Sequence, residues 1–139
     1  MAAEEDLDKL LALLNPSLLA GDFVFCTIES AQYGDFADLQ PIASYQEEEG
    51  LSLLLAKGAA DTAGLAYESV FSCISLMVHS SLNAVGLTAV VSAGLAAHGI
   101  SANMIAAYYH DHVYVPKDKA QLALQVLAEL RLQIIRLEN

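Results

Sequence analysis

The strongest constraint on the fold lies in residues 78–116, where apolar segments alternate with short polar breaks. An apolar segment ends in the polar elbow His79-Ser80-Ser81, and helix-forming residues follow it. We predict that the helix begins near Asn83, whose side-chain oxygen can accept an amide proton that the first turn leaves unpaired. The apolar stripe of this helix, on a 3.6-residue period, consists of Leu87, Val91 and Leu95. Gly99 ends the helix, because glycine suits the left-handed position after a last turn.

The same stretch continues as two strands joined by a tight turn. Residues 100–109 are uncharged and compatible with a strand, and residues 112–115 form the next one. We predict that His110 and Asp111 make the turn, since aspartate side chains bond to nearby turn backbone. Tyr108 and Tyr109 are interpreted as core and rim residues, as is usual for aromatic side chains in strands.

These residues resemble the ACT domain, a ferredoxin-like βαββαβ module. The resemblance covers residues 23–130 and is best between residues 79 and 116. Its motifs are the elbow His79-Ser80-Ser81-Leu82, the helix opening Asn83-Ala84-Val85-Gly86-Leu87, the link Gly99-Ile100-Ser101-Ala102-Asn103 and the hairpin Tyr108-Tyr109-His110-Asp111-His112. Asn83 stands where the usual motif has an acidic residue, which weakens any charge-based contact there to a ligand amine.

The resemblance implies an α+β fold with two ferredoxin-like ACT-type modules in tandem, forming one compact body. Residues 1–66 would be a degenerate N-terminal module and residues 67–139 the C-terminal ACT domain. ACT domains bind amino acids or other small metabolites and regulate an attached or partner protein. A more specific resemblance is to small stand-alone bacterial proteins with tandem ACT-like modules, related in shape to the animal cytosolic arginine sensor.

The remaining elements follow from periodicity and from Gly and Pro positions. The predicted helices are residues 6–14, 57–65 and 120–130. The predicted strands are residues 23–28, 41–45, 51–55 and 71–78, with a hairpin turn at Glu47-Glu48-Glu49-Gly50. Residues 30–40 are expected to be a loop, and residues 132–137 fit either a helix continuation or a fourth strand.

Composition excludes several classes of protein. The net charge of −11 argues against nucleic-acid binding, which needs Lys and Arg to neutralise phosphates. No apolar run reaches the ~20 residues of a spanning helix, and no charged-then-apolar leader opens the chain. We therefore expect a cytoplasmic protein. Cys26 and Cys73 lie in apolar surroundings and are interpreted as small buried residues.

The resemblance places the ligand site at the elbow. A strand that ends before a helix N-terminus offers free amide protons and the positive end of the helix dipole, which suits a carboxylate. The predicted ligand-binding residues are His79, Ser80, Ser81, Asn83, Val85, Gly86, Leu87, Asn103, Met104 and Glu49. Glu49 would hold an ammonium group or a basic side chain. The alternative is that Ser and Asn only cap the helix.

The overall prediction is a regulatory, allosteric sensor that binds a small molecule, an amino acid, and acts by a conformational or assembly change. No cofactor, metal or catalytic residue is assigned, and a homodimer with an unidentified regulated partner is expected. One rival is a metal-dependent or histidine-assisted enzyme that uses His79, His110 and His112. No third ligand follows His110 and His112 at a characteristic spacing, however. Another is an oligomerisation module without a ligand. Phosphate-loop, nucleophile-elbow and HExxH motifs are missing from the sequence.

Overall fold

The computed structural model describes the backbone of residues 3–138 and the side chains of residues 3–133. Its helices are α1 (Leu7–Ala12), α2 (Lys57–Ala63), α3 (Leu87–Ala96) and α4 (Ala120–Glu138), with short 3-10 turns at Ala37–Leu39 and Lys117–Lys119. Its strands are β1 (Ser17–Leu18), β2 (Phe23–Ile28), β3 (Ala43–Glu47), β4 (Gly50–Ala56), β5 (Phe71–Ser75), β6 (Asn103–Ala106) and β7 (Asp111–Pro116). The predicted α+β class is confirmed.

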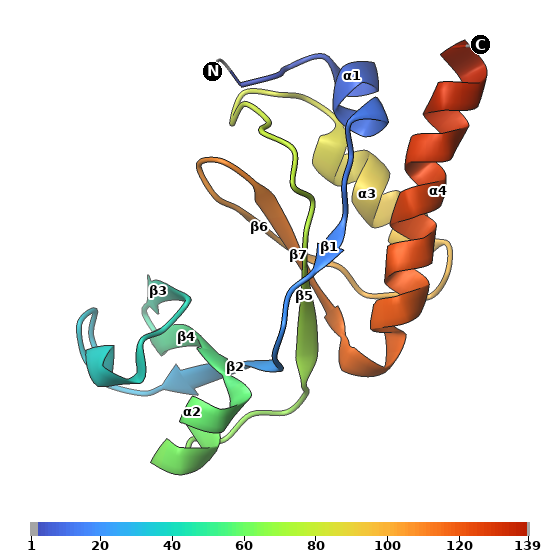
Figure 1. Ribbon diagram of the computed structural model, residues 1–139. Coiled ribbons are helices and arrows are strands. Elements are labelled where there is room, and N and C mark those ends of the chain that lie inside the picture. The colour runs from blue at the N-terminus through green and yellow to red at the C-terminus, as the bar shows by residue number, and fades with distance from the viewer. Residues whose placement is uncertain (1–2, 139) are drawn as a thin grey trace. The chain divides into compact units, whose positions relative to one another are not determined.

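Contacts divide the chain into two units (Figure 1). The middle unit is Ala20–Phe71, and the terminal unit combines Met1–Leu19 with Ser72–Asn139. Helix α1 therefore groups with the C-terminal half of the sequence. The division into modules at residues 66 and 67 stays a prediction.

The middle unit is an antiparallel sheet in the order β3-β4-β2, with α2 packed on β2 and β4. Strand β2 alternates, so that Val24 and Cys26 are buried while Phe25 and Thr27 face outward. The predicted hairpin is confirmed, because β3 and β4 pair from Ala43 with Leu54 to Glu47 with Gly50. A Cβ atom at Gly50 would lie 2.6 Å from the Ile28 carbonyl oxygen, so only glycine fits this close approach.

The sheet of the terminal unit places β7 between β5 and β6, and β1 pairs with β5 antiparallel. On β7, Val113 and Val115 are fully buried in the core. Strand β1 was not predicted from the sequence. It has only two residues, and its place is set by pairing of Ser17 with Ser75 and Leu18 with Ile74 rather than by its own pattern.

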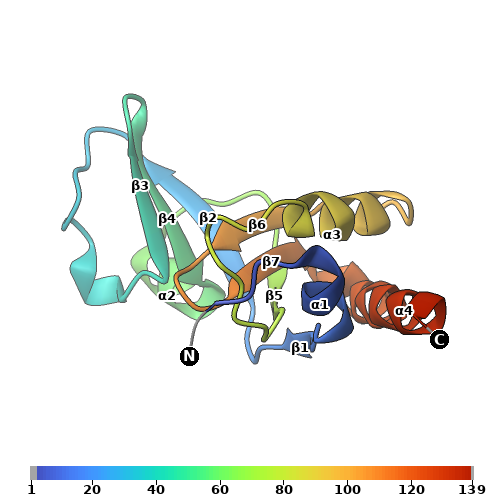
Figure 2. The ribbon, with the colours of Figure 1, turned by 90° about the horizontal axis from the view of Figure 1, so that it is seen from above.

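Helices α1, α3 and α4 pack against one another and cover the β5-β7-β6 strands (Figures 1 and 2). The predicted apolar stripe of α3, residues Leu87, Val91 and Leu95, is buried in this core. Asp6 caps α1 by accepting a hydrogen bond from the Lys9 amide at 3.0 Å. Residues 132–137, which the sequence left open between a helix continuation and a fourth strand, are helical, because α4 continues to Glu138.

Both cysteines are buried and free, as the sequence predicts. Burial raises the pKa of the Cys73 thiol above its ordinary value, and a hydrogen bond from Tyr114 acts in the opposite direction. The thiolate is the reactive form of cysteine, so a raised pKa makes this side chain a structural one.

Candidate functional site

The candidate site is built on the elbow that joins β5 to α3. The N-terminal segment lies alongside this elbow and pairs with it through backbone hydrogen bonds. The Glu4 amide donates to the His79 carbonyl at 3.0 Å, and the Ser81 amide donates to the Glu4 carbonyl at 2.9 Å. The Ser81 hydroxyl also donates to the Glu5 carboxylate at 3.1 Å. These bonds fix the backbone of the elbow from the side of the N-terminal segment.

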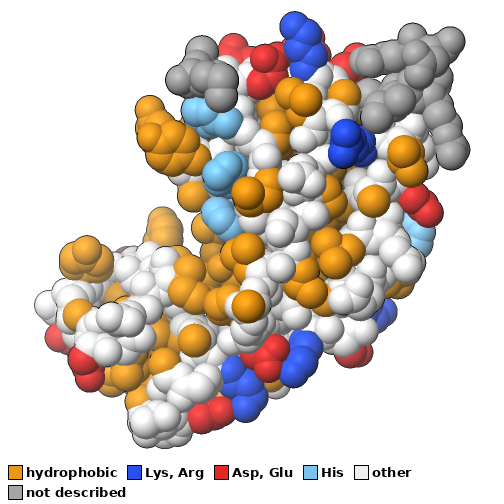
Figure 3. All heavy atoms as spheres, in the orientation of Figure 1, with side chains coloured by type: hydrophobic (Ala, Val, Ile, Leu, Met, Phe, Trp, Pro, Cys, Tyr) orange, Lys and Arg blue, Asp and Glu red, His pale blue; other side chains and the backbone are white. Residues whose placement is uncertain are grey.

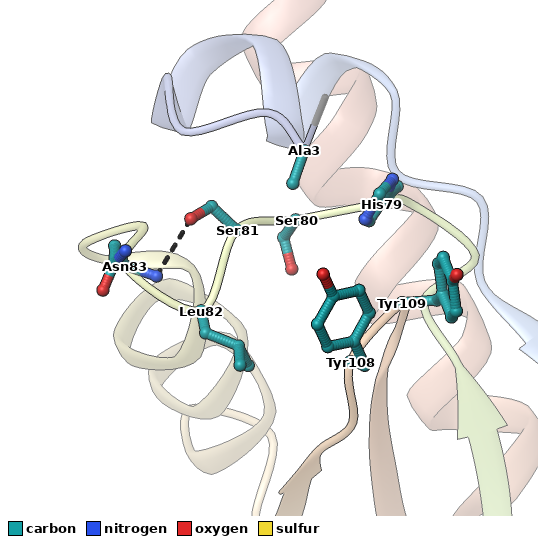
Figure 4. Close-up of a pocket in the computed structure, with 8 residues that line it drawn as sticks. All are labelled: Ala3, His79, Ser80, Ser81, Leu82, Asn83, Tyr108 and Tyr109. Carbon is teal, nitrogen blue, oxygen red and sulfur yellow. Dashed lines mark hydrogen bonds between the residues drawn. The ribbon is translucent and has the colours of Figure 1, made fainter. Parts of the chain in front are cut away.

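A cleft of about 460 Å³ opens beside the elbow (Figure 4). Its walls are Ala3, His79, Ser80, Ser81, Leu82, Asn83, Tyr108 and Tyr109. The Ser80 and Tyr108 hydroxyl groups both point toward the middle of the cleft. The Tyr109 ring packs against His79 and Tyr108, at centroid distances of 5.2 and 5.1 Å. The cleft therefore combines hydroxyl groups with aromatic faces.

A smaller cavity of about 150 Å³ lies next to the same loop, at the start of α3. Its walls include Ser80, Ser81, Gly86, Leu87, Thr88, Ala106 and Asp111. Ser80, Ser81 and Leu82 line both cavities. Residues 80–82 thus contribute both to the smaller cavity and to the larger, partly aromatic cleft.

The prediction that Asn83 caps the helix is wrong. The Asn83 amide donates to the Ser81 hydroxyl oxygen at 3.0 Å, and the Ala84 amide donates to the Ser81 carbonyl at 3.0 Å. These local bonds make a turn of residues 81–84 and delay the helix. The cap residue is Gly86, with φ of 106°, and no side chain bonds to the first-turn amides.

The N-terminus of α3 therefore reaches the small cavity without a side-chain cap. The first amides of a helix have no partner within the helix, and those of Leu87 and Thr88 belong to residues that line the cavity. The positive end of the helix dipole lies at the same place and favours an anion. A Cβ atom at Gly86 would lie 2.9 Å from the Leu7 Cδ2 atom, so this position combines a positive φ with close packing against α1.

The prediction that Asp111 lies in the turn before the last strand is also wrong. The turn consists of residues 107–110, closed by a bond from the Ala107 amide to the His110 carbonyl at 3.1 Å. Asp111 is instead the first residue of β7, and its backbone carbonyl accepts from the Leu76 amide at 3.0 Å. Its side chain is buried, lines the small cavity and accepts from the Ser80 hydroxyl at 3.3 Å.

The histidines give no metal centre in the part of the chain that the structure describes. No group of three or more His, Cys, Asp or Glu side chains is arranged there to hold a metal ion. Histidine side chains do gather on one face, next to projecting hydrophobic side chains (Figure 3). Of the three in the rival hypothesis, His79 lines the large cleft, whereas His110 and His112 line neither cavity.

The other predicted ligand residues have different surroundings. Val85 is 83% exposed and lines neither cavity. On β6, Met104 packs against the core, and the Asn103 side chain donates to the Tyr114 carbonyl at 3.3 Å. Glu49 is exposed in the turn between β3 and β4 of the middle unit. Their part in ligand binding stays a prediction.

Sequence reasoning missed several residues that line the cavities. They are Ala3, Leu82, Ala84, Thr88, Ala106, Tyr108, Tyr109 and Asp111. A signal was available for Asp111, because it is the first charged residue after Glu68 and follows a long apolar region. Aspartate is almost never fully buried unless it is paired, so a buried one is an informative observation. The two tyrosines are 72% and 61% exposed and belong to the rim of the cleft, not to the core.

The middle unit has a hollow of its own, of about 410 Å³. It is lined by residues of the loop after β2 and the start of β3, among them Tyr33, Asp35, Gln40 and Ser44. Gln46 holds this loop, accepting from the Tyr33 amide at 2.8 Å and donating to the Ala31 carbonyl at 3.2 Å. No residue predicted for the site lies here.

The chain belongs to the ACT domain family, and it contains two such domains in tandem. One family model, described as an ACT domain, matches residues 2–72, and a second with the same description matches residues 68–129. The predicted tandem ACT architecture is confirmed by these matches and by the fold.

Solved structures extend this likeness. A Vibrio cholerae protein of unknown function, described as a possible transport protein, is 53% identical, with a TM-score of 0.82 over 90% of this chain and 95% of that one. An Agrobacterium tumefaciens protein is 16% identical, with a TM-score of 0.71 over 85% and 89%. The regulatory subunit of aspartate kinase from Thermus thermophilus is 14% identical, with a TM-score of 0.60 over 83% and 95%. The last two show likeness of fold alone.

The chain has no significant match among curated proteins. None of the helices in the described part of the chain has the length and apolar character that crossing a bilayer requires.

Proposed function

We propose that this protein is a regulatory module that binds an amino acid at the elbow between β5 and α3. The observation that carries the proposal is the small cavity at the uncapped N-terminus of α3, lined by Gly86, Leu87 and Thr88. Backbone amides at a helix N-terminus bind carboxylates well, because they donate hydrogen bonds and lie in the positive field of the helix dipole. A ligand carboxylate would accept hydrogen bonds from these amides.

The two cavities suit the two parts of an amino acid. The small cavity has room for the main-chain groups, and the larger cleft has room for a side chain. Ser80 and Ser81 line both, so their hydroxyl groups can donate to or accept from a ligand that passes between them. Tyr108 and Tyr109 would provide the apolar contact that fixes the side chain.

The family supports a regulatory role. The aspartate kinase chain that shares this fold is a regulatory subunit. Binding would act by shifting a conformational or assembly equilibrium, by an amount limited to the ligand's differential affinity for the two states. In this proposal the protein is cytoplasmic, catalyses no reaction, forms a homodimer and acts on a partner protein.

A thermal-shift panel of the twenty amino acids tests this function. A ligand at a hundred times its dissociation constant should stabilise the protein by about 2.7 kcal/mol, which raises its melting temperature by several degrees. The expected result is stabilisation by one amino acid or a few related ones. The matched variant is Ser80→Ala, which removes a hydroxyl that lines both cavities and should weaken that stabilisation. Ser101→Ala, at an exposed position outside both cavities, is the matched control and should leave it unchanged. A panel without any stabilising amino acid would contradict the proposal.

A further inference from the structure

Asp111 is the first residue of β7 and carries a carboxylate. Among the described side chains, Asp111 is the one charged group that is buried, with 9% of its surface exposed. Burying a charge is costly unless an opposite charge or hydrogen bonds compensate for it. Asp111 has one side-chain hydrogen-bond partner among the described residues, and its oxygens are not among the fully buried atoms that lack a partner, so its free oxygen is reached from the cavity.

The strand explains why this carboxylate faces the cavity. Residues 111, 113 and 115 of β7 share one face, because side chains alternate along a strand. Val113 and Val115 fill the core, and Asp111 ends the same row where the core gives way to the small cavity. Its cross-strand neighbour on β6, Ala106, lines the cavity as well and has too short a side chain to cover the carboxylate.

The hydrogen bonding of Asp111 is incomplete. Its Oδ2 atom accepts from the Ser80 hydroxyl at 3.3 Å, longer than the usual 2.5–3.0 Å of such a bond. In the described part of the chain, Oδ1 accepts no hydrogen bond and the carboxylate forms no ion pair with a lysine or arginine. Ionised carboxylates can accept several hydrogen bonds, so most of this capacity is unused.

We propose that Asp111 accepts the α-ammonium group of the ligand and so selects α-amino acids over other carboxylic acids. This proposal rests on the proposed function and adds the group that discriminates between ligands. The α3 N-terminus and Asp111 line the same cavity of about 150 Å³, so its walls combine a group that favours an anion with a group that favours a cation. An α-amino acid carries these two charges on adjacent positions. Ser80, which donates to Asp111, holds the carboxylate toward the cavity.

The experiment compares amino acids with 2-hydroxy acids, which keep the carboxylate and replace the ammonium with a hydroxyl. The probes are L-alanine with L-lactate, L-leucine with L-2-hydroxyisocaproate and L-phenylalanine with L-phenyllactate, titrated calorimetrically into the full chain. For at least one pair, the amino acid should bind about ten- to a hundredfold more tightly, as expected for a hydrogen bond between charged groups. In Asp111→Asn, which keeps the size of the side chain, this preference should fall to less than about threefold. Asp118→Asn, at an exposed position outside both cavities, is the matched control and should keep the preference.

The outcomes separate this proposal from the proposed function. An amino acid that binds while its hydroxy acid binds equally well overturns the role of Asp111 and leaves the regulatory proposal standing. So does a preference that survives in a folded Asp111→Asn variant, with folding checked by circular dichroism. If none of the three amino acids binds, the pair is made from the amino acid that the thermal-shift panel selects and its 2-hydroxy acid, and a panel without any stabilising amino acid overturns both proposals. The comparison of ligands on the wild-type protein remains decisive even where the variant does not fold.

Discussion

Replacing Gly86 with alanine tests the geometry of the site at its most sensitive position. Gly86 has φ of 106°, a conformation that residues with a Cβ rarely adopt. An added Cβ would also lie 2.9 Å from the Leu7 Cδ2 atom, so the end of that side chain would have to move. Helix propensity favours alanine by roughly 1 kcal/mol, but Gly86 is the cap rather than part of the helix, so this gain does not apply.

The expected cost follows from these terms. The left-handed conformation costs a residue with a Cβ roughly 1–2 kcal/mol. Displacing Leu7 adds about 1 kcal/mol, the lower end for overpacking, because the contact involves the end of a half-buried, flexible side chain. Alanine also lowers the conformational entropy of the unfolded chain, which stabilises the folded protein by roughly 0.4–1 kcal/mol. The net destabilisation should be about 1–3 kcal/mol, which lowers the melting temperature by roughly 3–10 °C in a chain of this size.

The assay is a melting curve of Gly86→Ala beside Gly94→Ala. Gly94 lies within α3, and a Cβ there would make an ordinary contact of 3.4 Å with Leu130, so Gly94→Ala should be neutral or should stabilise the protein by up to about 1 kcal/mol. Gly86→Val should cost more than Gly86→Ala, because a branched side chain is larger and stiffer. The reasoning is refuted if Gly86→Ala is as stable as the wild type.

Three further predictions follow from other parts of the molecule. We expect a homodimer, and light scattering that gives a monomer mass at micromolar concentration without ligand would contradict this. His110→Ala with His112→Ala should leave the metal content of the purified protein unchanged, whereas loss of a stoichiometric metal would revive the enzyme hypothesis. In the middle unit, the Lys57 ammonium hydrogen-bonds to Asp61 at 2.7 Å and lowers the pKa of that carboxyl group. The stabilising effect of this pair is present above the ordinary aspartate pKa and is lost as the pH falls through the lowered value. In an NMR titration, Lys57→Ala should raise the Asp61 pKa, and an unchanged pKa would count against the contact.

Much of the fold could be predicted because local patterns and tertiary structure agree. The α3 stripe of Leu87, Val91 and Leu95 is buried as its period indicates. The β3–β4 hairpin also forms, because its glycine occurs where the backbone of Ile28 approaches. Strand β1 could not be predicted, since a two-residue segment takes its structure from β5 and not from its own sequence.

The candidate site was only partly predictable, and the reasons are physical. Asn83 has the residue type of a helix cap, but Ser81 bonds to its amide and forms a turn first. Asp111 has the residue type of a turn, but the hairpin closes one residue earlier and leaves it in β7. Both errors come from hydrogen bonds that depend on three-dimensional neighbours. The elbow itself was predicted, because the change from an apolar strand to a polar segment is visible in the sequence.

The most direct test of the central claim is an NMR titration of the isotope-labelled protein with the amino acid that gives the largest thermal shift. Our account predicts saturable changes in the amide signals of Gly86, Leu87 and Thr88, with smaller ones at Ser80 and Asp111, because the ligand carboxylate would bond to the first turn of α3. Saturable changes confined to the hollow near Tyr33 and Ser44, with the α3 signals unmoved, would contradict it.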